Sequence, residues 1–217
     1  MELGRMRWPA VGEPIVVVPV GSCEQHGPHL PLDTDTVVAM ALSDALARAR
    51  DDVVVAPPLA VTASGEHQGF PGTLSIGTEI MAGTIIELAR SADWASGVVF
   101  VNGHGGNVTA MQRAAEVFAV ERRRVLVWWP RFDDADPHAG HTETSLMLHL
   151  DPERVDLDAA VAGPIPSLPD LVRHGVLPLS ETGVLGDPTA ASAADGRALF
   201  DDLVGQLRSA VADWADT

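Results

Sequence analysis

The chain has a single cysteine, few basic residues and no long apolar run. One cysteine in 217 residues excludes a disulfide within the chain, and a reducing compartment suits such a protein. Lys and Arg together number 14 against 30 Asp and Glu, which gives a formal net charge of −16. A surface so acidic repels phosphate backbones and anionic lipid, so we expect neither nucleic acid nor a membrane as a partner.

The apolar stretches are also too short for membrane targeting. None approaches the roughly 20 residues of a membrane-spanning helix, and the first ten residues, MELGRMRWPA, lack the apolar core of a signal peptide. We therefore expect a cytoplasmic protein. A hydrophobic content of 46% with 20% charged residues is typical of a compact globular chain. The length predicts a single domain over residues 1–217.

Runs rich in β-branched residues alternate with helical patterns. Four apolar runs have strand length, as expected of parallel strands buried on both faces: 15–20, 53–57, 97–102 and 124–129. Helical patterns lie at 36–50, 78–92, 107–123, 142–150 and 192–214. This alternation implies right-handed crossovers and a layered α/β fold with a mainly parallel sheet. The proline-rich segment 151–190 is predicted to be irregular, and to cover the site or a subunit contact.

Most of the histidines follow the predicted strands. In open α/β sheets, functional loops lie beyond the carboxyl ends of the strands. Six of the eight histidines fall there, on all four loops: His26 and His29, His67, His104, and His138 and His141. We therefore expect these loops to meet at one edge of the sheet.

The loop after the first strand, GSCEQHGPHLPLDTD (21–35), is the densest in ionisable groups. Glu24 and His26 are two residues apart in an extended segment, so both side chains point to the same side. Asp35 comes where the next helix begins, and its carboxylate could reach the same cation and bridge to a second one. Alternatively, Asp35 caps the helix and Glu24 is solvated. This loop alone leaves both interpretations open.

The glycine-rich turn VNGHGGN (101–107) carries His104, and Asn107 opens the next helix. A phosphate cradle is the alternative interpretation, but the glycine spacing matches neither GxGxxG nor the P-loop and no lysine follows. Imidazole is the commonest metal ligand, which favours a metal site. The glycines would let a substrate approach the N–H groups of Gly105 and Gly106.

Two further loops carry candidates. HAGHTETS (138–145) offers His138 as a ligand or proton donor, and Glu143 as a ligand or as a carboxylate facing the helix dipole. The loop ASGEHQGFPGT (63–73) is typical of substrate binding and carries Ser64, Glu66 and His67, although a purely structural histidine is equally expected there. Carboxylate and imidazole ligands without thiolates suit Zn²⁺, Mn²⁺ or Fe²⁺ at an open hydrolytic site. Two such ions about 3.5–4 Å apart would activate a bridging water.

Together, these four motifs closely resemble the creatininase family of metal-dependent amidohydrolases, over about residues 14–150. The resemblance implies a three-layer α/β/α fold, two divalent metal ions per subunit and a closed homo-oligomer, commonly a hexamer. It implies that Asp35 bridges the two ions and that His138 is the acid/base residue. The other ligands that it implies are Glu24, His26 and His104.

One position departs from creatininase itself. Creatininase has a metal-binding glutamate two residues after the histidine of the third loop, where this chain has Gly106. The NGHGGN form is that of the wider family, in which Glu143 is the natural replacement ligand. The substrate tryptophans of creatininase also find no match, since Trp128 and Trp129 belong to the fourth predicted strand. Creatinine is therefore not the expected substrate.

Within the family, LDTDT, ASGEHQGFPGT and HAGHTETS look most like members that are peptidases of a modified ribosomal precursor peptide. Those members remove most of the peptide and leave its C-terminal Val-Tyr-derived unit. Formamide hydrolases of archaeal flavin and deazaflavin biosynthesis are the other similar members, and both groups cleave a C–N amide bond. An acidic protein suits a peptide better than a phosphorylated substrate. A non-catalytic metal-binding α/β protein is the alternative from another class.

A cysteine hydrolase with Cys23 as nucleophile is a further alternative, which the neighbouring Glu24 disfavours because a carboxylate opposes thiolate formation. If a metal-bound water is the nucleophile instead, Cys23→Ser should retain most of the amide-hydrolysis activity. The rate of amide cleavage by the metal-loaded variant measures this. A loss of more than about a thousandfold, in the range expected for deletion of a nucleophile, would favour the cysteine mechanism. Roles for His29 and His141 do not follow from the sequence.

Overall fold

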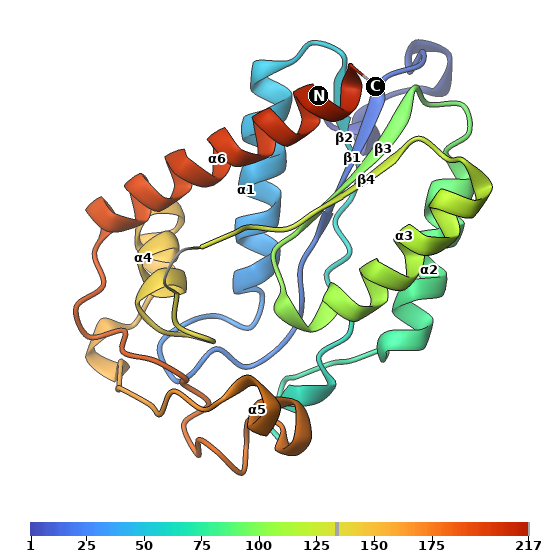
Figure 1. The fold of residues 1–217 in the computed structure, drawn as a ribbon. Helices are drawn as coiled ribbons and strands as arrows, with labels where there is room; N and C mark the ends of the chain where they lie inside the picture. The colour runs from blue at the N-terminus through green and yellow to red at the C-terminus, as the bar shows by residue number, and fades with distance from the viewer. Residues whose placement is uncertain (133–134, 217) are drawn as a thin grey trace.

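The computed structural model describes residues 1–132 and 135–216. Within these ranges the central sheet has four parallel strands in the order β2-β1-β3-β4 (Figure 1). They are β1 (Ile15–Val20), β2 (Val53–Val55), β3 (Gly97–Asn102) and β4 (Val125–Trp128). β1 and β3 pair over their whole length, with Val20 opposite Asn102. Because all strands run in the same direction, the loops that leave their carboxyl ends meet at one edge of the sheet.

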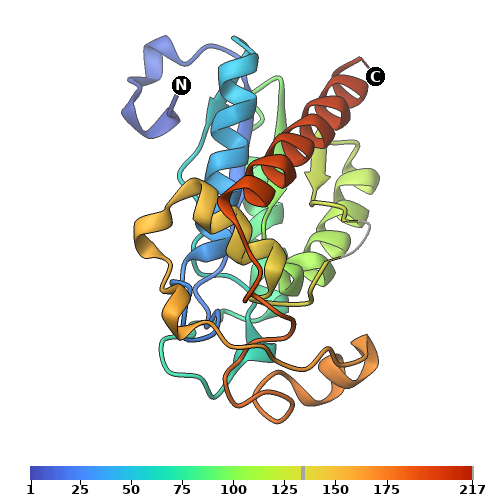
Figure 2. The ribbon, with the colours of Figure 1, turned by 90° about the vertical axis from the view of Figure 1, so that its left-hand side faces the viewer.

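Helices cover both faces of the sheet. One face is covered by α1 (Thr34–Ala49), α4 (His141–Leu150) and α6 (Ala193–Ala215), and the other by α2 (Thr78–Ser91) and α3 (Val108–Glu121) (Figures 1 and 2). Apart from Asn102 at the end of β3, the strands have no polar side chains, because successive residues alternate between two cores. In β1, Val16 and Val18 face α2 and α3, whereas Ile15 and Val17 face α1 and α6. The predicted three-layer α/β/α fold with a parallel sheet is confirmed.

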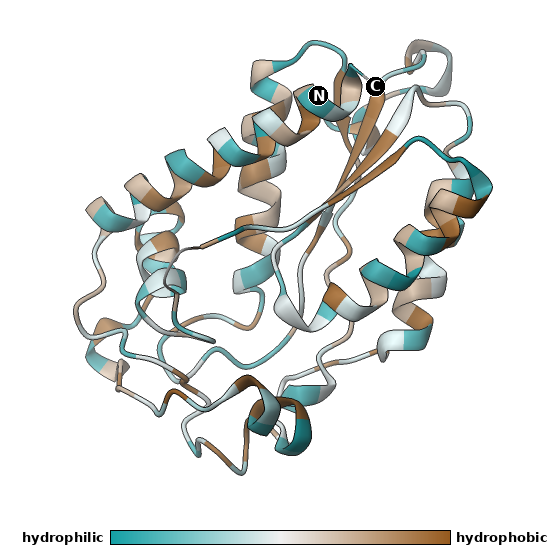
Figure 3. Ribbon diagram, viewed as in Figure 1, coloured by the Kyte–Doolittle hydropathy of each residue, from teal (hydrophilic) through white to brown (hydrophobic). Residues whose placement is uncertain are grey.

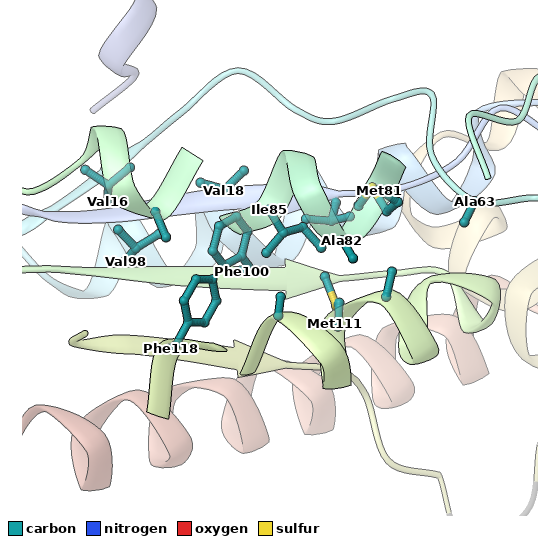
Figure 4. Packing of buried hydrophobic residues seen from close by; sticks show 14 of the residues in the cluster. Val16, Val18, Ala63, Met81, Ala82, Ile85, Val98, Phe100, Met111 and Phe118 are labelled. Carbon is teal, nitrogen blue, oxygen red and sulfur yellow. The ribbon is translucent and has the colours of Figure 1, made fainter. Parts of the chain in front are cut away.

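The core on the α2 and α3 side is built around Phe100 of β3 (Figure 4). Phe100 is fully buried, and its ring lies parallel to that of Phe118 with 6.4 Å between centroids. Met81 and Ile85 of α2 and Met111 of α3 are also completely buried there. Figure 3 shows the resulting pattern, with hydrophobic residues concentrated on the sheet and on the helix faces turned toward it.

Most predicted elements match the structure within a few residues. The second strand ends at Val55, two residues early, since Pro57 and Pro58 have no N–H to continue the ladder. The third helix pattern begins as a 3₁₀ turn, η4 (Gly105–Asn107), before α3. Other short turns are η1 (Leu3–Arg5), η2 (Trp8–Ala10) and η3 (Gly65–His67).

Segment 151–190 is not wholly irregular, because it contains η5 (Pro152–Arg154), η6 (Leu157–Ala159) and α5 (Leu168–His174). It lies at the carboxyl edge of the sheet, on the opposite side of the molecule from both termini (Figure 1). Val176 N–H donates to Glu66 O at 2.8 Å, and Leu185 exchanges two backbone hydrogen bonds with His138. The segment thus packs against the loops that follow β2 and β4. None of the described helices combines the length and the apolar character needed to cross a bilayer.

Candidate metal centre

Asp35 lies where the loops after β1 and β3 meet. It is in the first turn of α1, and its side chain is 3% exposed. Oδ2 accepts a hydrogen bond from Ser22 Oγ at 2.8 Å and lies 3.1 Å from His104 Nδ1, while Oδ1 lies 3.1 Å from His26 Nε2. The N-cap of α1 is Asp33, so Asp35 does not cap the helix. Each of its oxygens faces a different histidine.

The predicted ligands form two overlapping groups with their ligand atoms within 4.8 Å of one another. The first group is Glu24, Asp35 and His104, and the second is His26, Asp35 and Glu143. Asp35 belongs to both, which is the arrangement required of a carboxylate that bridges two cations. The described residues contain a third such group, Glu24 with His26 and His138.

Glu143 enters the second group from the start of α4. Its Oε2 accepts a 2.6 Å hydrogen bond from Ala139 N–H and lies 3.9 Å from His26 Nε2. Ala139 has a φ of +52°, a left-handed conformation that non-glycine residues rarely adopt. The strained residue thus holds the carboxylate that completes the group.

Glu24 provides the clearest sign that the site fits a cation. Both of its carboxylate oxygens are buried with no partner in hydrogen-bonding geometry, an expensive arrangement for a charged group. Burial raises the pKa of Glu24 to about 7, against the lowering effect of His104. A cation bound between Glu24, Asp35 and His104 would compensate the buried charge.

His26 and His104 lie among buried carboxylates, which raise the pKa of both imidazoles. Burial alone would lower the pKa of His26, but Asp35 raises it to about 10. The pKa of His104 is likewise lowered by burial and raised by Glu24 and Asp35, to about 10. These imidazoles hold protons where metal ions could bind, and metal binding would displace them. Carboxylate oxygens and imidazole nitrogens without thiolates suit Zn²⁺, Mn²⁺ or Fe²⁺.

His138 lies beside both groups with one nitrogen directed into the site. Its Nε2–H donates to Gln25 O at 2.7 Å. Its Nδ1 therefore faces Glu24 Oε1 at 3.8 Å and Glu143 Oε2 at 3.9 Å. Burial, together with His26 and His67, holds the pKa of His138 well below its usual range. An unprotonated Nδ1 in this position suits a proton acceptor, and it equally suits a ligand, because ligand histidines commonly donate their other N–H to a carbonyl.

The predicted substrate loop also borders the site. Ser64 and His67 are buried, and His67 Nε2 lies 3.3 Å from Glu24 Oε1. Glu66 Oε1 lies 3.6 Å from His104 Nε2. A Cβ at Gly106 would collide with this Glu66 oxygen, whereas a Cβ at Gly105 would meet nothing within 4 Å. The glycine turn is therefore open at Gly105 and occupied by a carboxylate at Gly106.

The structure brings four of the six loop histidines together: His26, His67, His104 and His138. His29 instead has its Nε2 2.8 Å from Thr144 Oγ1, and His141 lies 3.4 Å from Asp195 on α6. Cys23 is half-buried, and its thiol donates to Gly72 O at 3.6 Å. The metal groups among the described residues do not include these three residues.

Asn107 is a structural residue of the site that the sequence interpretation placed only as a helix start. It does precede α3, but its side chain makes no capping bond. Its Oδ1 accepts from Ala63 N–H at 3.1 Å, and its Nδ2 donates to Gly21 O and Asn102 Oδ1 at 3.0 and 3.1 Å. One buried amide thus links the loops that follow β1, β2 and β3. The sequence feature that could have indicated this role is the polar residue at the end of VNGHGGN.

Residues 4–211 match the family model described as creatininase, creatinine amidohydrolase. The chain belongs to the creatininase family. This confirms the resemblance carried by the four motifs. The family and the relatives below identify the chain as a hydrolase that acts on C–N bonds.

Known members differ in how similar they are to this creatininase-family chain. A protein named mycofactocin precursor peptide peptidase, from Mycolicibacterium smegmatis, is 49% identical over 212 residues, which cover 93% of this chain and 85% of the relative. A creatininase structure with one tryptophan changed to phenylalanine has a TM-score of 0.80 at 26% identity, covering 97% of both chains. A manganese form of creatininase has a TM-score of 0.79 at 25% identity, with 97% of both chains covered.

The hydrogen bonds of Asn107 predict that its replacement lowers the free energy of unfolding. Asn107→Ala would leave the buried Ala63 N–H unpaired and remove one of the two donors to Gly21 O, which Thr62 Oγ1 also serves, so we expect a loss of about 1–3 kcal/mol in the free energy of unfolding. Urea unfolding of metal-free protein measures it. Ser43→Ala is the control, because buried Ser43 Oγ donates only to Ala39 O within α1, and it should cost less. Equal stability of Asn107→Ala and wild type would contradict the structural role.

Proposed function

We propose that the chain is a divalent-metal-dependent peptidase that hydrolyses an amide bond of the modified mycofactocin precursor peptide and releases its C-terminal Val-Tyr-derived dipeptide. The observation that carries the hydrolytic part is the pair of ligand groups that share Asp35. The substrate is supported by the 49% identity to a relative named for that peptidase activity.

Two ions would be held at the overlapping groups. Glu24, Asp35 and His104 would hold one ion, and His26, Asp35 and Glu143 the other. When bound, such ions supply a water of lowered pKa and polarise the carbonyl under attack. Zn²⁺, Fe²⁺ or Mn²⁺ suits these ligands.

His138 would move the proton. Its Nδ1 accepts a proton from the attacking water as the water oxygen bonds to the carbonyl carbon. The same Nδ1 then donates that proton to the amine nitrogen as the C–N bond breaks, so the histidine returns to its starting state. The hydrogen bond from Nε2–H to Gln25 O keeps Nδ1 directed into the site throughout.

The substrate would lie against the loops after β2 and β3. Backbone N–H groups at Gly105 and Gly106 are proposed to stabilise the oxyanion, and the space beside Gly105 is open. Ser64, Glu66 and His67 are proposed to bind the peptide. In this loop, Glu66 keeps 28% of its side chain exposed, which makes it available to a polar group of the substrate.

The proposed enzyme is a single metallohydrolase domain that works in the cytoplasm as a homo-oligomer, a hexamer or similar. The acidic composition and the family resemblance support this. Large apolar side chains on the described surface, such as Trp8 and Ile80, are 87% and 63% exposed, which is in keeping with a subunit interface.

Metal removal tests the central requirement. Chelation should abolish cleavage of the modified precursor peptide, because Glu24 and Asp35 would lose the cations that position and activate the water. Zn²⁺, Mn²⁺ or Fe²⁺ should restore cleavage, read as peptide products by mass spectrometry. Full activity in a sample that elemental analysis finds free of metal would rule the mechanism out.

Two substitutions separate the proposed ligand from the proposed proton carrier. Glu143→Gln should lower metal content or affinity, since a neutral amide is a poorer ligand for a hard cation. His138→Asn should keep both ions and lower turnover by roughly 10²–10⁴, the usual weight of general acid–base catalysis. Elemental analysis and the rate of amide cleavage are measured on the same preparations.

Glu153→Gln and His174→Asn are matched controls for these two changes, because both residues are exposed. Each should behave like wild type in metal content and rate. If Glu143→Gln keeps both ions while His138→Asn loses one, the two assignments are reversed and His138 is the ligand.

A further inference from the structure

Gln25 lies in the sequence between the proposed ligands Glu24 and His26. It belongs to none of the candidate metal groups that the described residues form. Its side chain is buried and makes three hydrogen bonds, to Gly27, His67 and Gly183. Its main-chain oxygen makes a fourth, from His138 Nε2–H at 2.7 Å. One residue therefore contacts both His67 and His138, the two histidines that border the site.

The backbone partners fix the orientation of the Gln25 amide. Gly27 N–H can only donate, and it lies 2.8 Å from the Gln25 oxygen. Gly183 O can only accept, and it lies 3.0 Å from the Gln25 nitrogen. The Gln25 nitrogen must therefore be the atom 2.9 Å from His67 Nδ1, and this nitrogen can only donate.

The amide orientation in turn sets the protons on both rings. Because His67 Nδ1 accepts from Gln25, neutral His67 carries its proton on Nε2, which lies 3.3 Å from Glu24 Oε1. Because His138 Nε2 donates to Gln25 O, neutral His138 has an unprotonated Nδ1 facing the same Glu24 oxygen. The two rings are 4.3 Å apart between centroids. Side by side, they therefore present an N–H and a lone pair to one carboxylate oxygen.

The fold holds Gln25 firmly in this position. Gly183 has a φ of +80°, and a Cβ there would collide with the Gln25 amide. Gly27 has a φ of +67°, and Gln25 N–H donates to Thr73 Oγ1 at 3.1 Å. Contacts from segment 151–190 and from the loop after β2 thus close around the amide. Such close packing leaves the side chain little freedom to change partners.

We propose that Gln25 is a positioning residue that fixes the protonated nitrogen of His67 through its side chain and that of His138 through its main chain. This rests on the proposed function for the roles of the two histidines. The N–H on the Glu24 side of His67 can donate to a substrate oxygen. The lone pair of His138 is the proton acceptor. Loss of the donor on the Gln25 side chain would disturb the position of the proton on His67 and leave the lone pair of His138 in place.

Gln25→Glu is the sharpest test, since it keeps the shape and the acceptor for Gly27 N–H but removes both donors. A carboxylate beside His67 Nδ1 should draw a proton onto that nitrogen, while His138 keeps its proton on Nε2. Histidine ¹⁵N NMR of the metal-free and the Zn²⁺-loaded protein reads both rings. Turnover should fall about 10–100-fold, the usual cost of disturbing a residue that supports a metal site from outside its ligand set.

Gln112→Glu is the matched control, because it makes the same change at an exposed position of α3, and it should leave NMR spectra and turnover unchanged. Should Gln25→Glu fail to fold, Gln25→Met replaces it, with His67 then expected to populate both tautomers and turnover to fall similarly. A His67 ring that keeps the wild-type tautomer, or turnover within twofold of wild type, would overturn the proposal. The NMR measurement needs no substrate, so a wild-type protein inactive on the precursor peptide would count against the proposed function alone.

Discussion

The confinement of three carboxylates at one edge of the sheet is the constraint on which the rest of the site depends. Glu24 and Asp35 are buried, and the carboxylate of Glu143 joins them from α4. Such a group is stable only if positive charge lies among the oxygens. His26 and His104 supply it as protonated rings, each with a pKa of about 10. The same oxygens and nitrogens are suitable ligand atoms for a divalent cation. One arrangement of side chains therefore suits both the metal-free and the metal-bound protein.

The parallel sheet explains why these groups meet at all. The two central strands, β1 and β3, pair with Val20 opposite Asn102. The loops that carry Glu24, His26 and His104 therefore leave the sheet side by side. Asn107 then joins these loops to that after β2 through three hydrogen bonds. The rigid layers thus limit how far the ligands can move apart, which is what an active site built on loops requires.

The fold could be predicted from the sequence because it rests on short-range patterns, whereas the proposed ligand set was implied by the resemblance to the creatininase family. Continuous apolar runs identified the strands, and Glu24, His26 and His104 follow those runs directly. Gln25 and Asn107 could not be assigned, since an amide has no preferred partner until the loops are placed. No role for His29 and His141 followed from the sequence, because position after a strand does not set the direction of a side chain, and their partners are Thr144 and Asp195. The short helices within segment 151–190 were missed because its prolines suggest an irregular chain.

The contact between Glu66 and Gly106 has a consequence for how the family can diversify. Any side chain introduced at position 106 would collide with the Glu66 carboxylate, with His104 Nε2 and with the backbone oxygen of Ala63. Because one of these neighbours is main chain, shortening residue 66 alone would not open the position. A side chain at position 106 therefore requires the loops after β2 and β3 to move apart, so this position can change only together with the backbone at the border between the proposed metal site and the proposed peptide site.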